Sequence, residues 1–236
     1  MSTAVIIGGG DFPRKPYPRE LIRRADIIVC CDGNALKAFL RNRKAIFGED
    51  NRLPEAIVGD MDSMTPKLAK DYSNRLVKIE EQDDNDQTKA LHYILDHYPE
   101  VDTIHILAAT GRREDHTVGN LGLLMEYART LPSCHPERCP EPVEGRSEGS
   151  LPQLDMISDY STAFVVTDSC DLILGRGRKI SLFSPDNSLK LKSKGLVWPT
   201  DNVVFDNWWP VTLNRTNEDV IHLDFSHKSL VLIITD

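Results

Sequence analysis

The feature that most constrains the fold is a series of short, almost uninterrupted apolar runs in the first 130 residues. The runs are Val5-Ile6-Ile7, Ile27 to Cys31, Ala56-Ile57-Val58, Leu76 to Ile79 and Ile104 to Ala108. Such runs are typical of strands that are buried on both faces, as in a parallel sheet. The segments 86–98 and 117–129 carry apolar residues at helical spacing. In the second segment the expected apolar face consists of Val118, Leu121, Leu124, Met125 and Ala128. This alternation predicts an α/β domain with an open, mainly parallel sheet flanked by helices.

From residue 151 onward the pattern is that of a β protein. Short β-branched and aromatic runs are separated by Gly, Pro, Asn and Asp, and no helical period is evident. These runs are Phe164-Val165-Val166, Ile180 to Phe183, Ile221 to Phe225 and Leu230 to Ile234. We expect a second, antiparallel domain, a β-sandwich or a barrel-like form. The predicted domains are therefore 1–150 and 151–236.

Residues 132–150 differ from both domains. They contain four prolines and four glutamates, with Val143 as their one aliphatic residue. Such a segment cannot bury enough apolar surface to offset its ordering entropy, so we predict a disordered insertion whose deletion leaves folding and activity nearly intact. Cys134, His135 and Cys139 lie within it, but no second ligand pair accompanies them, which disfavours a metal site.

Charge and cysteine content exclude several classes. The chain has 28 Lys+Arg against 36 Asp+Glu, a formal net charge of −8, which argues against a general nucleic-acid binder. No apolar run reaches the roughly 18 residues that a membrane span requires. The first residues lack the basic region of a secretory signal. The odd number of cysteines, five, fits reduced thiols, so we expect a cytoplasmic protein without membrane partners.

Aspartates follow several of the predicted strands. Asp32 ends one strand, Asp60 and Asp62 follow another, and Asp86 and Asp115 lie in later segments next to helices. Ligands of an open parallel sheet bind beyond the carboxyl ends of its strands. Carboxylates that converge there repel one another unless a cation is present, and oxygen ligands select Mg²⁺ with bound phosphate. The pattern therefore outlines a nucleotide-phosphate site.

Each acidic segment also has a simpler interpretation. Asp32-Gly33-Asn34, taken alone, is typical of a turn that caps a helix. Asp60 and Asp62 are harder to assign to a solvated loop, because they lie two residues apart directly after a buried strand. Most charges of 80–89 are expected to be solvated, and Asn85 or Asp86 suits a helix cap. We single out Asp86 in this segment.

Other phosphate-binding signatures are absent or incomplete. Gly8-Gly9-Gly10 follows a strand, but Pro13 stands where the third glycine of a dinucleotide fingerprint belongs, and no Walker-type sequence occurs. The segment Gly111 to His116 offers Arg112 and Arg113 beside Asp115. Arginine binds phosphate through two parallel hydrogen bonds, although a surface salt-bridge cluster is the alternative interpretation.

Taken in order along the chain, the motifs resemble those of the thiamine pyrophosphokinase family. The matching segments are Asp32 to Ala35 (D-G-G-A), Gly59 to Ser63 (G-D-x-D-S), Asn85 to Leu91 (T-D-x-x-K-A-L), Gly111 to His116 with Asn120 (G-G-R-x-D-H…N), Gly195 to Pro199 (G-L-x-[WY]-P) and Leu213 to Asn217 (G-x-S-N). Each motif is weak alone, but their combination in order is specific. The chain departs from the pattern at Asn34, Arg112, Asn214 and Thr216, and 132–150 has no counterpart in it.

The resemblance implies an α/β domain that holds ATP and Mg²⁺ and a C-terminal β-sandwich that completes a thiamine site, across a homodimer interface. It implies transfer of the diphosphoryl group of ATP, the co-substrate, to the hydroxyl of thiamine, with release of AMP. The implied Mg²⁺ ligands are Asp60, Asp62 and Asp86, which with Arg113 form the catalytic set. Cofactor-binding roles are implied for Asp32, Gly33, Asp115, His116, Trp198 and Asn217. For Trp198 and Asn217 a core aromatic and a turn residue are equally good interpretations.

Three rival functions stay open at this point. Transfer to another small alcohol, such as a pterin, would use the same metal site with a different pocket. A non-catalytic sensor of thiamine or nucleotide would keep the acids without turnover, but binding alone needs fewer carboxylates. A Rossmann-type dehydrogenase is disfavoured because the third glycine is missing.

Overall fold

The computed structural model describes residues 1–130 and 152–236. The predicted insertion at 132–150, its Cys134, His135 and Cys139, and the predicted domain boundary at residue 150 lie outside the described residues. The chain divides into two compact units. Unit 1 comprises Met1–Leu123 and Met156–Asp159, and unit 2 comprises Leu124–Asp155 and Tyr160–Asp236.

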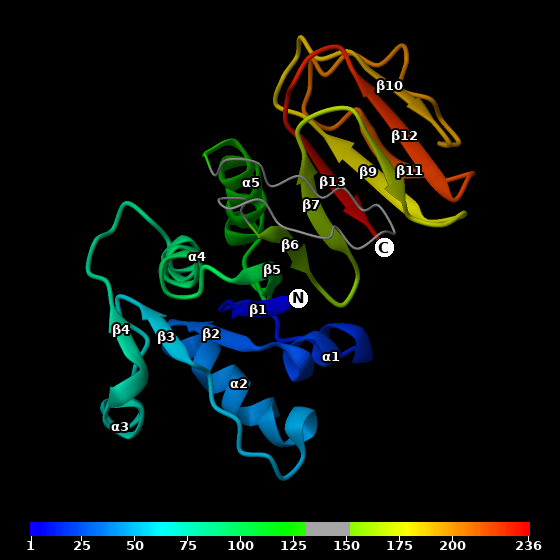
Figure 1. The fold of residues 1–236 in the computed structure, drawn as a ribbon. Coiled ribbons are helices and arrows are strands. Elements are labelled where there is room, and N and C mark those ends of the chain that lie inside the picture. The colour runs from blue at the N-terminus through cyan, green and yellow to red at the C-terminus, as the bar shows by residue number, and fades with distance from the viewer. Residues whose placement is uncertain (131–151) are drawn as a thin grey trace. The chain divides into compact units, whose positions relative to one another are not determined.

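Unit 1 alternates strands and helices, as the sequence predicts (Figure 1). Its elements are β1 (Ser2–Ile7), α1 (Pro16–Arg24), β2 (Ile27–Cys31), α2 (Asp32–Phe47), β3 (Ala56–Gly59), α3 (Pro66–Asp71), a 3₁₀ turn (Ser73–Arg75), β4 (Leu76–Lys78), α4 (Asp86–His97) and β5 (Val101–Leu107). Helix α5 (Glu114–Thr130) begins in unit 1 and ends in unit 2. The order β5-β1-β2-β3-β4 is joined by parallel pairs throughout. The predicted parallel sheet is confirmed.

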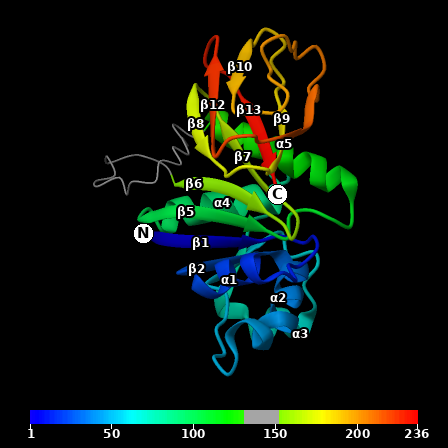
Figure 2. The ribbon, with the colours of Figure 1, turned by 90° about the vertical axis from the view of Figure 1, so that its right-hand side faces the viewer.

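Helices cover both faces of this sheet. Figures 1 and 2 show α4 on one face and α1 with α2 on the other. Phe39 of α2 and Ile94 of α4 are fully buried against the strands, and each contributes about 2 kcal/mol through burial of its side chain. Since both faces are covered, the strands carry almost continuous apolar runs. Within α5 one expectation is wrong: Val118 is 61% exposed, and Leu124 and Tyr127 are the buried positions.

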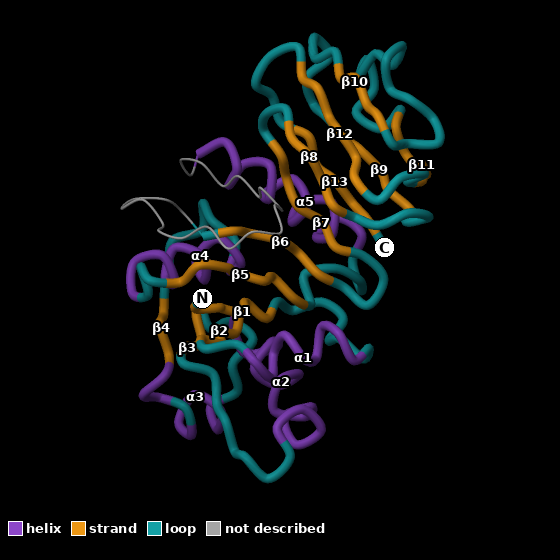
Figure 3. The backbone as a smooth tube through the Cα atoms, turned by 45° about the vertical axis from the view of Figure 1, so that its right-hand side comes forward, coloured by secondary structure: helices purple, strands orange, loops and turns teal. Residues whose placement is uncertain are grey.

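Apart from the end of α5, the described part of unit 2 is built from strands and loops, and residues 152–236 contain no helix (Figure 3). Its elements are β7 (Thr162–Val166), β8 (Cys170–Ile173), β9 (Lys179–Phe183), β10 (Leu191–Lys194), β11 (Val211–Arg215), β12 (Val220–Phe225) and β13 (Val231–Thr235), and β6 (Gln153–Ile157) is divided between the units. One antiparallel sheet has the order β11-β9-β13-β7, and the other has the order β10-β12-β8.

The two antiparallel sheets share one apolar core. Leu182 and Ile233 from the first sheet and Leu172, Leu191 and Ile221 from the second belong to a single buried cluster. This packing is that of a β-sandwich, so the predicted fold class is confirmed in both parts. Among the described residues, none of the helices combines the length and the apolar character that crossing a bilayer would need.

Candidate active site

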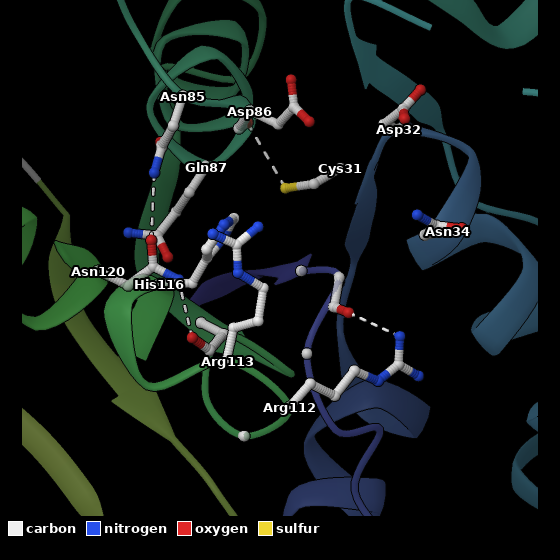
Figure 4. A pocket seen from close by; sticks show the side chains of 15 residues that line it. Cys31, Asp32, Asn34, Asn85, Asp86, Gln87, Arg112, Arg113, His116 and Asn120 are labelled. Carbon is white, nitrogen blue, oxygen red and sulfur yellow. Dashed lines mark hydrogen bonds between the residues drawn. The ribbon is translucent and has the colours of Figure 1, made fainter. Parts of the chain in front are cut away.

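A pocket of about 410 Å³ opens at the carboxyl ends of the strands of unit 1 (Figure 4). From β1 the chain proceeds outward to β4 and then returns to β5, on the other side of β1. The order of the strands therefore reverses between β1 and β5, and such switch points are where open α/β sheets bind ligands. The lining residues come from the loops after β1 and β5 and from the starts of α2, α4 and α5.

The glycine loop after β1, residues 8–11, packs directly on the loop after β5. Gly8 N–H donates to Leu107 O at 2.8 Å, and Gly10 N–H donates to Ala108 O at 2.6 Å. A Cβ atom at Gly10 would lie 2.3 Å from Thr110 O, so the close approach requires glycine there. The N–H of Gly9 has no acceptor within residues 1–130 and 152–236. This donor is suited to a phosphate oxygen.

Asp32 is the first residue of α2, but it does not cap that helix. Cys31 occupies the cap position, and Asp32 has a left-handed backbone with φ 57°. Its side chain is buried, Oδ2 accepts from Ser63 N–H at 3.0 Å, and Oδ1 has no partner among the described residues. A buried carboxylate oxygen without a partner is costly, and a cation would relieve that cost.

Asp86 lies close to Asp32. Asn85 caps α4 by accepting from Thr88 N–H at 2.9 Å, which leaves the Asp86 carboxylate available for another role. A Cβ atom at Gly59 would lie 2.9 Å from Asp86 Oδ1 and 3.1 Å from Asp32 Cβ, so the two acids flank this glycine. Burial, followed by the negative charges of Asp32 and Asp60, raises the pKa of the Asp86 carboxyl. A cation is the natural complement of this set.

Asp60 and Asp62 lie in the loop after β3 and do not line the pocket. Asp60 Oδ1 accepts from Asp62 N–H at 3.0 Å, and this bond, with the one from Gln82, lowers the pKa of Asp60. Asp62 is exposed. The loop itself is fixed to α2, because Ser63 accepts from Asn34 N–H through Oγ and from Lys37 Nζ through its carbonyl. A Cβ atom at Gly33 would lie 2.7 Å from Ser63 O, so Gly33 permits this contact.

The acids do not form a complete metal cage by themselves. Among the described residues, no group of three or more His, Cys, Asp or Glu side chains is arranged to hold a metal ion. Mg²⁺, however, is commonly bound by one or two carboxylates together with substrate phosphates and water. The unpartnered Asp32 Oδ1 and the neighbouring Asp86 carboxylate fit that kind of site. The joint role of Asp60, Asp62 and Asp86 stays a prediction.

The basic side of the pocket comes from the loop after β5. Arg113 lines the pocket, and its Nε and Nη2 atoms both donate to the carboxylate of Asp115. This pairing raises the pKa of Arg113 and lowers that of Asp115. His116 also lines the pocket, whereas Asp115 does not. Arg113, which faces the pocket (Figure 4), is thus held by an acid in the first turn of α5.

Two residues within the family motifs, Lys89 and Asn120, received no role from the sequence. Lys89 is 3% exposed and donates from Nζ to Ile79 O at 3.2 Å and to Glu81 O. Its charge adds to the lowering of the Asp60 pKa that the Asp62 N–H causes, and it partly offsets the rise of the Asp86 pKa that burial causes. The signal was present, because a lysine inside an apolar helical stripe is rarely buried without a role. Asn120 joins two segments of the pocket lining, since its Oδ1 accepts from Asn85 Nδ2 and its Nδ2 donates to Ala109 O.

Trp198 and Asn217 belong to unit 2 and flank the β-bridge between Leu196 and Thr216. Trp198 is 60% exposed, so the alternative of a core aromatic is wrong. Asn217 is exposed, and its N–H donates to Gly195 O at 2.9 Å, as in a turn. The unusual residues Asn214 and Thr216 are buried and hydrogen-bonded, Asn214 to Trp198 O and Thr216 to Gly175 O, so they stabilise this region.

Comparison with known families gives two matches along the chain. The model described as the thiamin pyrophosphokinase catalytic domain matches residues 18–134. The model described as the thiamin pyrophosphokinase substrate-binding domain matches residues 163–232. The two matches follow one another and together cover most of the chain.

Curated relatives and solved structures agree with these matches. The chain is 31% identical to thiamine pyrophosphokinase 1 of Oryza sativa subsp. japonica over 139 residues, 53% of this chain and 52% of the relative. It is 31% identical to thiamine pyrophosphokinase 1 of Arabidopsis thaliana over 141 residues, 54% and 52% of the two chains. The match thus spans about half the length of these curated relatives. The fold is similar to that of thiamin pyrophosphokinase from Candida albicans, with a TM-score of 0.74 and 19% identity over 99% of this chain and 88% of that one. It is also similar to that of thiamine pyrophosphokinase from Bacillus subtilis, with a TM-score of 0.71 and 19% identity over 100% of this chain and 99% of that one.

Proposed function

Because the chain belongs to the thiamin pyrophosphokinase family, we propose that it is a thiamine diphosphokinase. It transfers the diphosphoryl group of ATP to the hydroxyl group of thiamine, which gives thiamine diphosphate and AMP. The single observation that carries the proposal is the pocket at the switch point between β1 and β5, where backbone N–H groups, guanidinium groups and carboxylates converge. This combination suits a polyphosphate with a bound cation.

In this reaction the hydroxyl oxygen of thiamine attacks the β-phosphorus of ATP. A new O–P bond forms, the bond from the β-phosphorus to the oxygen that bridges the α- and β-phosphates breaks, and AMP leaves with that electron pair. Charge develops on phosphate oxygens, so catalysis depends mainly on positioning and electrostatic stabilisation. Bound Mg²⁺ would neutralise part of that charge.

Individual residues take roles that their surroundings support. Asp86, with Asp60 and Asp62, is proposed to hold Mg²⁺, and the unpartnered oxygen of Asp32 adds a ligand or an acceptor for a bound water. Asp86 also orients the thiamine hydroxyl and accepts its proton. Arg113 contacts phosphate, since Asp115 already fixes its guanidinium at the pocket.

Four further residues are proposed to contact the substrates or to shape the site. Gly33 allows the start of α2 to approach the loop after β3, and His116 lines the phosphate side of the pocket. In unit 2, the exposed ring of Trp198 offers a face to the cationic thiazolium of thiamine, and Asn217 offers amide hydrogen bonds. We further propose that the protein is a homodimer and that it is cytoplasmic; the buried thiols of Cys30 and Cys31, which form no disulfide among the described residues, support the second point.

A product assay tests this function. The purified protein is incubated with thiamine, ATP and Mg²⁺, and AMP and thiamine diphosphate are quantified together. Equal amounts of the two products are expected. If AMP forms only with another acceptor alcohol, the protein is a diphosphotransferase whose substrate is not thiamine. Thiamine binding by folded protein without any AMP would favour a sensor and contradict an enzyme.

A further inference from the structure

Arg112 adopts a backbone conformation that an arginine rarely takes. It follows Gly111 in the loop after β5 and has φ 62°, in the left-handed region that favours glycine. The family pattern has glycine at this position, so this chain keeps a bulky cation where the backbone disfavours one. Such strain persists where the side chain makes contacts that offset it.

The contacts of Arg112 join the two loops of the switch point. Its Nη1 donates to Gly9 O at 3.0 Å, and its Nε lies 3.6 Å from Asp11 Oδ1. Gly9 O and Gly10 N belong to one peptide group, and Gly10 N–H donates to Ala108 O. Arg112 and Ala108 therefore hold this peptide group at both ends.

The fixed Gly9–Gly10 peptide group leaves the N–H of Gly9 available to a ligand. The N–H of Gly9 has no acceptor in the described part of the chain, and no atom lies within 4 Å of the position of a Cβ at Gly9. Space and a donor are thus available at the same point of the pocket lining. The guanidinium of Arg112 makes one hydrogen bond, whereas that of Arg113 is engaged at two atoms by Asp115. Arg112 is the cation with more donors left for a ligand.

We propose that Arg112 determines the affinity of this chain for the phosphate chain of a nucleotide. It holds the glycine loop so that Gly9 N–H stays available to phosphate, and it adds a guanidinium charge beside that phosphate. This inference rests on the proposed function in one respect, that the ligand of the pocket is a nucleotide. It names a residue that the family pattern does not supply.

Calorimetric titration with Mg·ADP in the absence of thiamine tests the proposal. Arg112→Gln removes the charge, and Arg41→Gln, on an exposed position of α2, is the matched control. We expect the Kd of Arg112→Gln to rise about tenfold, since a charge-assisted contact is lost, and that of Arg41→Gln to stay within about twofold. In steady-state assays the KM for ATP should rise while kcat changes little, because binding is lost equally in ground and transition states.

Arg112→Gly separates binding from folding. Glycine relieves the left-handed backbone, so the midpoint of thermal unfolding should not fall, while the Kd for Mg·ADP should rise as in Arg112→Gln. A merely structural role predicts that unfolding midpoint and affinity fall together. Mg·ADP binding by both variants within about twofold of the wild type would overturn the proposal.

A failure of the proposal for Arg112 can be distinguished from a failure of the proposed kinase function. Wild-type protein that binds Mg·ADP but forms no thiamine diphosphate would contradict the kinase and leave the comparison of Arg112 variants valid. Wild-type protein that does not bind Mg·ADP even at millimolar concentration would overturn both.

Discussion

Left-handed residues other than glycine gather at the ends of the strands that form the pocket. Asp32, Met61, Ala108 and Arg112 have φ values of 57°, 70°, 54° and 62°, and each lies in a segment that follows a strand of unit 1. Leu213 in unit 2 is the fifth such residue among those described. Strained backbone concentrates at functional sites, where surrounding contacts hold it in place. At the scale of single residues, therefore, the left-handed backbone conformations of unit 1 occur at the same end of the sheet as the pocket.

Asp86→Asn should separate stability from activity. Burial and the charges of Asp32 and Asp60 raise the pKa of Asp86 above its usual 3.8, so without metal its ionised form destabilises the fold. The folded state binds this proton more tightly, and the contribution of Asp86 to stability is therefore lost as the pH rises through its folded pKa. Without metal, calorimetry should find the variant more stable than the wild type near pH 7, by a margin that shrinks toward about pH 4.

The same variant should lose turnover by about a hundredfold or more and keep thiamine binding within about tenfold. Mg²⁺ with nucleotide should stabilise the wild type more than the variant. Asp83→Asn, an exposed acid of the same segment, is the control and should change none of these quantities. A less stable Asp86→Asn with normal turnover would show that the carboxylate has only a structural role.

At the scale of elements, burial decides what the sequence could predict. All five apolar runs of the first 130 residues coincide with strands. In β1, β2 and β3 most positions are buried and favour apolar residues, whereas β4, at the edge of the sheet, has no buried residue. Strands β6, β8, β10 and β11 were not predicted. Of these, β8 and β10 have one buried residue each, Leu172 and Leu191, and β11 alternates with polar residues, whereas β6 is mostly buried but is interrupted by Asp155. Helix α2 was not predicted as an element either, since polar residues interrupt its stripe of Ala35, Leu36 and Phe39.

The sequence could also predict part of the candidate site. Asp32 and Asp86 could be predicted as neighbours because strand ends and helix starts of a parallel sheet meet at one edge. The bond of Arg112 to Gly9 could not, since it joins residues 103 positions apart in the chain. The burial of Lys89 also depends on how the segment around Ile79 folds back over α4, which no local pattern specifies.

A polar cluster joins two loops of the sandwich and should make unit 2 sensitive to acid. Asp186 accepts from Ser188, from Ser229 Oγ at 2.7 Å and from His227 Nε2 at 2.9 Å. These bonds, that of Ser188 first, hold the pKa of Asp186 well below its usual 3.8. The stabilisation is therefore complete above about pH 4 and is lost as the pH falls further.

Asp186→Asn should reduce the stability of unit 2 by about 1–2 kcal/mol near neutral pH, because bonds to a charged acceptor become neutral ones. The difference from the wild type should shrink as the pH falls below about 4. The three tryptophans, Trp198, Trp208 and Trp209, all lie in unit 2, so their fluorescence during urea unfolding reports on this unit. The exposed Asp201→Asn is the control. The urea midpoints of Asp186→Asn and of the wild type are compared near neutral pH and below about pH 4. Equal midpoints at neutral pH as well as at the acidic pH would contradict this role of the cluster.

At the scale of the whole molecule, the two units divide the proposed chemistry. Unit 1 contains the pocket, the glycine loop and the acids, and the catalytic-domain model matches within residues 18–134. Unit 2 contains Trp198 and Asn217, and the substrate-binding model matches 163–232. Each unit has its own core, so substitutions in one core should leave the fold of the other intact.

The central claim is diphosphoryl transfer at the acidic edge of the unit 1 sheet. ATP labelled with ³²P at the β-phosphorus tests it most directly, in a reaction with thiamine and Mg²⁺. The label should appear in thiamine diphosphate and not in AMP, and the transfer should be abolished by a chelator and reduced about a hundredfold or more by Asp86→Asn. Label that stays in ADP, or transfer by Asp86→Asn at the rate of the wild type, would contradict the claim.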